Sequence, residues 1–332
     1  MSDLFDIKTL QGLDLSKLRS TSICVLGGTG FIGTWLISTL NQLDRDFGLK
    51  IEIAVYTRDI RKASVKYPRE LYNRVSLKEF DFLTGACNLG FFDYIINGAT
   101  PTTSKAGINT EDLYFHPTMN AVRSIIATAQ SKQNYPKVLN LSSGAVYGSQ
   151  PLDLLRRPEG LAVDPRGSDY YQRAKYQSEY ELSTPEALGV LAPISPRLFA
   201  FYGPGLPINQ HFAIGNFIRD GLEGRPIRIL GNPNTRRSYM YPTDLVAWLL
   251  KSMVNPKVGH FNIGSEDSIS MAELASLVSE MTSRKGIEFS NPEIPPNNYV
   301  PSTKLFRTEY DVEELVPLSE GLLSWKSWLT RN

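Results

Sequence analysis

Short apolar runs alternate with amphipathic helical patterns through the first half of the chain. Runs of this length, bounded by glycine, asparagine and charged residues, are typical of buried parallel strands. We expect strands over residues 22–26, 51–57, 75–80, 93–97, 137–141 and 190–199, and helices over residues 30–43, 109–131 and 168–182. The alternation predicts an α/β fold, namely a Rossmann-type doubly wound parallel sheet with a smaller C-terminal α/β substrate lobe.

The pattern changes after residue 150, where proline, arginine and glycine become frequent. We interpret residues 151–167 as a loop over the site. Three divisions follow: an N-terminal helical extension over residues 1–20, a dinucleotide-binding domain over 21–200, and a lobe over 201–332. The last is mainly a nucleotide-sugar substrate lobe, with some chain returning to the main sheet. The expected docking face of the extension consists of Leu10, Leu13, Leu15 and Leu18.

Composition and charge exclude several classes of protein. The 332 residues carry a formal net charge of +1, which gives no support for a nucleic-acid or anionic-membrane partner. Two cysteines do not make a disulfide framework, and the three histidines are scattered without metal-ligand spacing. There is neither a signal-peptide core nor an apolar run long enough to span a bilayer. We therefore expect a cytoplasmic protein with no bound metal.

Three glycines, Gly27, Gly30 and Gly33, directly follow the first predicted strand. In a dinucleotide site, one such glycine allows the tight turn and another lets the backbone approach the pyrophosphate. The third lets the helix pack close to the strand. The start of the following helix would direct its N–H groups at the phosphate. The pattern predicts a dinucleotide site, with a purely structural turn as the alternative.

A possible acid–base pair lies on the helix predicted over residues 168–182. Tyr171 and Lys175 are four residues apart and therefore share one helix face. A tyrosine ordinarily titrates near ~10, and a neighbouring ammonium lowers that pKa. Ser143 ends a buried strand, where its hydroxyl could bind a substrate oxygen. The alternatives are a chance pair on an exposed helix and a serine that only completes a turn.

Five motifs occur in an order that resembles the extended short-chain dehydrogenase/reductase family, also called the NAD-dependent epimerase/dehydratase family, in its nucleotide-sugar-modifying branch. The resemblance covers nearly the whole chain after residue 21. The motifs are the glycine turn of residues 27–33, LSSGAVYG at 141–148, Tyr171 with Lys175, PRLF at 196–199, and RSY at 237–239 with Asp244.

The resemblance implies a role for each site residue. Tyr171 would exchange a proton with a sugar hydroxyl or ketone, Lys175 would bind the nicotinamide ribose, and Ser143 would be the catalytic serine and contact the substrate. Besides Tyr171 and Lys175, the implied cofactor-binding residues are Gly27, Gly30, Phe31, Ile32, Gly33, Asp81, Phe82, Ala99, Thr100, Leu198 and Phe199. The implied substrate-binding residues of the lobe are Asn216, Phe217, Arg237 and Tyr299.

The sequence also departs from the family pattern. Ala200 and Thr118 stand where the family often keeps asparagine, which leaves the ligand contacts at those positions open. Gly144 and Ala145 follow the serine where sugar 4,6-dehydratases carry an Asp-Glu pair, so dehydration is not expected. The family resemblance also implies a homodimer.

The end of the second predicted strand bears on cofactor and reaction. Thr57 and Arg58 could receive a 2′-phosphate, which favours NADP; if the strand runs longer, Asp59 would bind the ribose and favour NAD. NADP in turn favours the NAD(P)H-dependent reduction of a 4-keto nucleotide sugar, as in deoxysugar or surface-polysaccharide synthesis. The alternatives are a nucleotide-sugar 4-epimerase with tightly bound NAD and a non-catalytic dinucleotide-binding sensor.

Overall fold

The computed structural model describes residues 10–66, 75–101, 110–132, 135–161, 163, 169–282 and 286–331, without the side chains of residues 65, 66 and 132. The chain divides into two compact units, and each unit is assembled from segments that are separated in the sequence. The first unit comprises Met1–Gly148, Ala162–Arg197 and Val246–Phe261. The second comprises Ser149–Leu161, Leu198–Leu245 and Asn262–Asn332.

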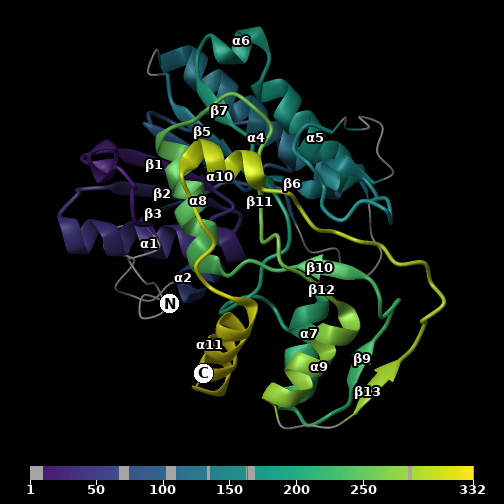
Figure 1. The fold of residues 1–332 in the computed structure, drawn as a ribbon. Coiled ribbons are helices and arrows are strands. Elements are labelled where there is room, and N and C mark those ends of the chain that lie inside the picture. The colour runs from purple at the N-terminus through teal and green to yellow at the C-terminus, as the bar shows by residue number, and fades with distance from the viewer. Residues whose placement is uncertain are drawn as a thin grey trace. The chain divides into compact units, whose positions relative to one another are not determined.

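A six-stranded parallel sheet forms the centre of the first unit (Figure 1). Its strand order is β3-β2-β1-β4-β5-β7, and each neighbouring pair is parallel. The strands are β1 (Ser22–Leu26), β2 (Glu52–Thr57), β3 (Val75–Glu79), β4 (Tyr94–Asn97), β5 (Lys137–Asn140) and β7 (Ala192–Ile194). The order runs outward in both directions from β1 and β4, which is the doubly wound arrangement. The predicted α/β, Rossmann-type fold is confirmed.

Amphipathic helices cover this sheet, and α4 packs against α5 (Figure 1). The helical elements are η3 (Leu15–Leu18), α1 (Phe31–Phe47), α2 (Ile60–Lys66), α4 (Glu111–Lys132), η4 (Gly144–Tyr147), α5 (Tyr170–Leu182), α6 (Pro185–Leu188) and the part of α8 (Pro242–Val254) from Val246 onward. One buried cluster joins Leu26 of β1 and Ile95 of β4 to Val122 and Ile125 of α4. Burial of such side chains is the main source of the unit's stability.

The chain differs from expectation at two places in the first unit. Residues 1–9 of the predicted extension lie outside the described residues, and Leu15–Leu18 forms a 3₁₀ turn instead of an α-helix. Leu10 and Leu18 are buried, while Leu13 and Leu15 are half-buried. The strand predicted over residues 190–199 is broken into β7 and β8 (Arg197–Leu198). Pro196 has no N–H with which to continue the ladder, so the strand stops before it.

The second unit combines short strand pairs with helices. β9 (Ile227–Ile229) pairs with β13 (Ile287–Phe289), and β10 (Arg236–Ser238) pairs with β12 (Ser268–Ser270). The remaining elements are α7 (Ala213–Leu222), β11 (Asn262–Ile263), α9 (Met271–Met281), α10 (Lys304–Tyr310), α11 (Leu318–Arg331) and the first residues of α8. α7 and α9 pack against each other and against β9 (Figure 1).

A buried carboxylate fastens the 149–161 segment within the second unit. Glu159 accepts hydrogen bonds from the backbone N–H groups of Asn262, Leu305 and Phe306 at 2.9–3.2 Å. Arg157 adds a backbone bond from its N–H to the Val300 carbonyl at 2.7 Å. The segment 149–161, most of which is predicted as a loop, is thus bound to the stretch of chain that contains Tyr299 and Val300.

Gly27 holds the turn between β1 and α1 in a conformation that suits no other residue. Its φ is +78°, a region that L side chains rarely adopt. A Cβ added there would lie 2.1 Å from the Gly98 carbonyl oxygen at the end of β4. The glycine is therefore required both by its backbone conformation and by the close approach of two strand ends.

We predict that Gly27→Ala lowers the free energy of unfolding by about 1–3 kcal/mol or more, because strain and overlap add. Gly160→Ala is a matched control, since a Cβ there has no heavy atom within 4 Å, and its effect should stay within about 0.5 kcal/mol. Chemical denaturation followed by circular dichroism measures both. Equal stability of the two variants would contradict the assigned constraint.

Candidate active site

A glycine-rich turn follows β1 where β1 and β4 end side by side. Both strands end at the same edge of the parallel sheet, since Leu26 is in register with Asn97. α1 begins at Phe31. Its N-cap residue, Gly30, has no side chain that could accept hydrogen bonds from the first N–H groups of the helix. Helix N-termini at such a switch point bind phosphate through backbone N–H groups. A turn without side chains at residues 27, 28 and 30 fits a dinucleotide pyrophosphate.

The end of β2 presents three residues with different surroundings. Thr57 is buried at the strand end, and its hydroxyl accepts the Asp59 N–H at 3.3 Å. Arg58 is exposed. The Asp59 carboxylate accepts the Lys62 N–H at 3.1 Å and pairs with the Lys62 ammonium at 3.4 Å. Asp59 is thus engaged in capping the start of α2, and Arg58 is the exposed charged residue at this strand end.

The other predicted cofactor residues follow β3 and β4. The Asp81 carboxylate accepts the Leu83 N–H within a turn, and Phe82 is buried in the core. The Ala99 N–H lies 3.4 Å from the Asn97 side-chain oxygen. The hydroxyls of Thr100 and Thr118 lie 2.8 Å apart. Thr118, which stands where the family often keeps asparagine, therefore binds the chain that follows β4.

Ser143, Tyr171 and Lys175 lie together in the first unit. Ser143 closes β6 (Ser142–Ser143), and its hydroxyl accepts the Ala145 N–H at 3.1 Å. Tyr171 and Lys175 share one face of α5, with the Lys175 Nζ 5.8 Å from the centre of the Tyr171 ring. A hydrogen bond joins the side chains of Ser143 and Tyr171. The three residue types needed for proton transfer to a sugar oxygen are thus brought together.

Burial controls the protonation of this group. It lowers the pKa of Lys175 to about 7, against the opposing charge of Glu179. It also raises the pKa of Tyr171, while the hydrogen bond with Ser143 acts in the opposite direction. The expected lowering of the tyrosine pKa by the ammonium is therefore wrong for this arrangement. The cause is desolvation, which outweighs the hydrogen bond at Tyr171 and also reduces the charge on Lys175.

Side chains of α5 hold the segment that carries Ser143. Lys175 Nζ donates to the Leu141 carbonyl at 2.6 Å, and the Gln172 side-chain amide donates to the Val146 carbonyl at 3.4 Å. Glu179 accepts a hydrogen bond from Ser142 at 2.5 Å. The three attachments lie at successive turns of one helix face. They fix the strand end against the helix on which Tyr171 lies.

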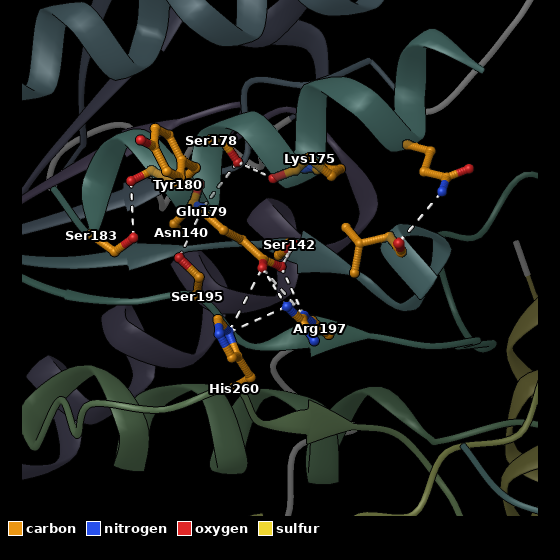
Figure 2. Close-up of polar contacts among 12 residues, drawn as sticks. Asn140, Ser142, Lys175, Ser178, Glu179, Tyr180, Ser183, Ser195, Arg197 and His260 are labelled. Carbon is orange, nitrogen blue, oxygen red and sulfur yellow. Dashed lines mark hydrogen bonds and ion pairs between the residues drawn. The ribbon is translucent and has the colours of Figure 1, made fainter. Parts of the chain in front are cut away.

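A second set of buried polar contacts in the first unit was not predicted from the sequence (Figure 2). Glu179 forms an ion pair with Arg197 at 2.8 Å, and the exposed His260 lies 3.2 Å from the same guanidinium. Asn140 accepts from Asn97 at 2.9 Å and donates to Ser178 at 3.1 Å. The spacing of Glu179, four residues beyond Lys175, was the signal that could have revealed the first of these contacts.

Four predicted residues gather in the second unit. The Tyr299 ring lies 4.5 Å from the Phe199 ring, and its hydroxyl donates to the Leu198 carbonyl at 3.2 Å. The Arg237 guanidinium lies 5.9 Å from the centre of the Tyr299 ring and also donates to the Asn297 carbonyl. Residues assigned to the nicotinamide border and to the substrate are therefore neighbours.

Asn216 and Phe217 have other surroundings on α7. The Asn216 amide donates to the Gln210 carbonyl at 2.8 Å, and its oxygen accepts from Arg219 at 3.0 Å. Phe217 is only 3% exposed. Its side chain packs in the unit's core, while Asn216 fastens the chain that leads into the helix.

Comparison with known proteins identifies a family model and curated relatives that match most of the chain. The model of the NAD dependent epimerase/dehydratase family matches residues 23–264. UDP-glucuronic acid decarboxylase 2 of Arabidopsis thaliana is 32% identical over 92% of this chain and 67% of its own length. UDP-glucuronic acid decarboxylase 1 of Xenopus tropicalis is 28% identical, over 93% and 72%.

Two solved structures share the fold. UDP-glucose 4-epimerase from Thermotoga maritima with UDP-glucose has a TM-score of 0.76 and 20% identity, covering 93% of this chain and 99% of its own. dTDP-glucose 4,6-dehydratase from Bacillus anthracis with NAD has a TM-score of 0.75 and 17% identity, with coverage of 94% and 97%. Separately, the helices within the described ranges are all too short or too polar to cross a membrane.

The buried Lys175 predicts a specific dependence of stability on pH. Between pH 7 and its ordinary pKa of 10.5, the unfolded chain holds a proton on Lys175 that the folded protein releases. The free energy of unfolding of the wild type should therefore rise relative to that of Lys175→Met as the pH increases through this window. The slope is at most about 1.4 kcal/mol per pH unit.

Urea denaturation at several pH values measures this difference. Lys62→Met is a matched control, because the Lys62 side chain is 88% exposed. This variant shows how far the change from lysine to methionine at an exposed position alters the measurement by itself. A constant difference for Lys175→Met would refute the assigned effect of burial.

Proposed function

Because the chain belongs to the NAD dependent epimerase/dehydratase family, as its motifs predicted, we propose that it is an oxidoreductase acting on ring carbon C4 of a nucleotide-diphosphate sugar. In this proposal the 4-hydroxyl is oxidised to a ketone and the ketone is later reduced again. The observation that carries the proposal is the grouping of Ser143, Tyr171 and Lys175 at the carboxyl end of the sheet. A nicotinamide, when bound, accepts the hydride from C4 and returns it.

The protein's own residues move the proton. Tyr171, as phenolate, takes the proton from the sugar hydroxyl while the C4–H bond breaks, and it returns that proton when the ketone is reduced. Ser143 donates a hydrogen bond to the same sugar oxygen and so stabilises its developing charge. Lys175 lies beside the Tyr171 ring and would bind the nicotinamide ribose, which would place the cofactor next to Tyr171. Over the whole reaction, one hydride and one proton leave the sugar when the hydroxyl is oxidised, and one of each returns when the ketone is reduced.

The substrate would be held through its diphosphate. Arg237 suits this task because its planar guanidinium can bind two phosphate oxygens at once. Its place beside Tyr299 and near Leu198 in the second unit supports a substrate role. The relatives' name suggests uridine diphosphate as the nucleotide part.

Oxidation at C4 is the first step of two different reactions. Return of the hydride to the opposite face would give the 4-epimer. A uronic acid oxidised at C4 is a β-keto acid, which loses carbon dioxide before the ketone is reduced, and the relatives' name suggests this outcome. Elimination of water is disfavoured, because Gly144 and Ala145 supply no carboxyl group beside Ser143.

We predict that Tyr171→Phe lowers kcat by about 10²–10⁴-fold, because the phenyl ring cannot accept a proton. Binding of the dinucleotide, followed by fluorescence, should change little. The assay incubates the protein with UDP-glucose or UDP-glucuronic acid and identifies products by nuclear magnetic resonance. Tyr170→Phe, on the neighbouring residue of α5, is the control. Near-wild-type turnover by Tyr171→Phe would refute the proposal.

A second candidate function is the NADPH-dependent reduction of a 4-keto nucleotide sugar. The observation that favours it is the end of β2, where Arg58 is exposed and Asp59 is engaged in capping α2. A charged arginine at this place suits the 2′-phosphate of NADP. A reductase would consume added NADPH, whereas an enzyme that returns its own hydride would release tightly held NAD on mild denaturation.

We expect Arg58→Ala to weaken binding of NADP about 10- to 100-fold, the effect of losing one or two charged hydrogen bonds. Binding of NAD should change less than threefold, because NAD lacks the 2′-phosphate. Isothermal titration calorimetry with both dinucleotides measures the two constants, and Arg61→Ala on α2 serves as control. Equal losses for NADP and NAD would remove the argument for NADP.

A further inference from the structure

One buried carboxylate contacts two segments that lead directly into predicted site residues. Glu179 lies on α5, one turn beyond Lys175 and two turns beyond Tyr171, and it is only 5% exposed. Figure 2 shows its carboxylate between Ser142 and Arg197. Ser142 immediately precedes Ser143, and Arg197 immediately precedes Leu198.

The bonds to this carboxylate define its position closely. Arg197 donates from Nε to Oε1 at 3.1 Å and from Nη2 to Oε2 at 2.8 Å. Ser142 Oγ donates to Oε1 at 2.5 Å. A two-point contact between arginine and carboxylate fixes both distance and angle. The start of β6 is therefore held against α5 by a group with little freedom to move.

The charge of Glu179 also acts on Lys175. The charged or titratable groups that face Glu179 are Arg197, His260, whose Nδ1 lies 3.9 Å from Oε2, and Lys175 on the preceding turn. Arg197 is covered in turn by the Tyr147 ring, 4.7 Å from its guanidinium carbon. The negative charge of Glu179 raises the pKa of Lys175, against the effect of burial.

We propose that Glu179 is a positioning residue for the Ser143–Tyr171–Lys175 group. Through its bonds with Ser142 and Arg197 it sets the place of the Ser143 hydroxyl relative to Tyr171, and it supplies a negative charge one helical turn from Lys175. The inference rests on the proposed function of these three residues. Glu179 itself does not touch the reacting atoms.

Three variants separate the mechanical effect from the effect of charge. Glu179→Gln keeps an oxygen for Ser142 but removes the charge. Ser142→Ala keeps the charge but removes the hydroxyl link. Glu181→Gln is the matched control on the same helix, where the native carboxylate accepts a bond from Gln177.

The first readout is steady-state kinetics. Glu179→Gln and Ser142→Ala should each lower kcat about 10- to 100-fold, the range expected when reacting groups are displaced slightly. KM for the nucleotide sugar should stay within about threefold, because neither variant alters a residue assigned to substrate binding. Glu181→Gln should leave both constants unchanged.

The second readout is the pH at which Lys175 loses its proton in the folded protein, measured without substrate or added cofactor. It is obtained from the difference in free energy of unfolding between each variant and the same variant carrying Lys175→Met, followed by urea denaturation at several pH values. Loss of the Glu179 charge makes the Lys175 ammonium less favourable, so Lys175 should lose its proton at lower pH in Glu179→Gln than in the wild type. Ser142→Ala and Glu181→Gln should titrate like the wild type.

Glu179→Gln leaves the Arg197 guanidinium buried without a counter-charge, which often prevents folding. The paired variant Glu179→Met with Arg197→Met replaces the ion pair by apolar side chains of similar length. It should show the same loss of kcat, because the bond that positions Ser142 is lost in both variants.

A folded Glu179→Gln with wild-type kcat and wild-type titration, or a folded paired variant with wild-type kcat, would overturn the inference and leave the proposed function standing. Loss of kcat with an unchanged titration in Glu179→Gln would overturn the assigned role of the charge. If the wild type turned over no nucleotide sugar, the proposed function would fail. The titration of Lys175 without substrate would still report whether the charge of Glu179 acts on Lys175.

Discussion

The buried hydrogen bond from Lys175 to the Leu141 carbonyl is the contact on which the candidate site depends. An ammonium group in an apolar interior is costly unless strong acceptors surround it. Here the Leu141 carbonyl lies 2.6 Å from Nζ, and the Glu179 carboxylate supplies a balancing charge from the next turn. The same bond joins α5 to the end of the sheet. One hydrogen bond of Lys175 therefore both attaches α5 to the sheet and fixes the position of the ammonium group in the candidate site.

The fold was predictable because local patterns and tertiary structure agree over most of the first unit. Apolar runs mark β1, β2, β4 and β5 within one or two residues of their observed ends. The break at Pro196 was readable in principle, since proline cannot donate to a strand ladder. The 3₁₀ turn at Leu15–Leu18 was not, because apolar spacing there fits several conformations.

The candidate site was predictable only in part. Tyr171 and Lys175 follow from helical spacing, but Glu179 was missed because a glutamate on a helix is ordinarily exposed. Its burial depends on Arg197, which comes from another element of the first unit. Similarly, Tyr299 and Phe199 are one hundred residues apart in sequence, and only the folded second unit brings their rings to 4.5 Å. No local pattern contains such a contact.

The assembly of each unit from separated segments has a consequence for biosynthesis. The Arg197 N–H binds the Phe261 carbonyl, and Lys137 Nζ binds the Val254 carbonyl, so the segment Val246–Phe261 is an integral part of the first unit. A ribosome makes about 5–20 residues per second, starting from the N-terminus. The glycine turn therefore emerges many seconds before the last segment that completes its own unit. During that interval the nascent sheet exposes the apolar surface that the segment Val246–Phe261 later covers.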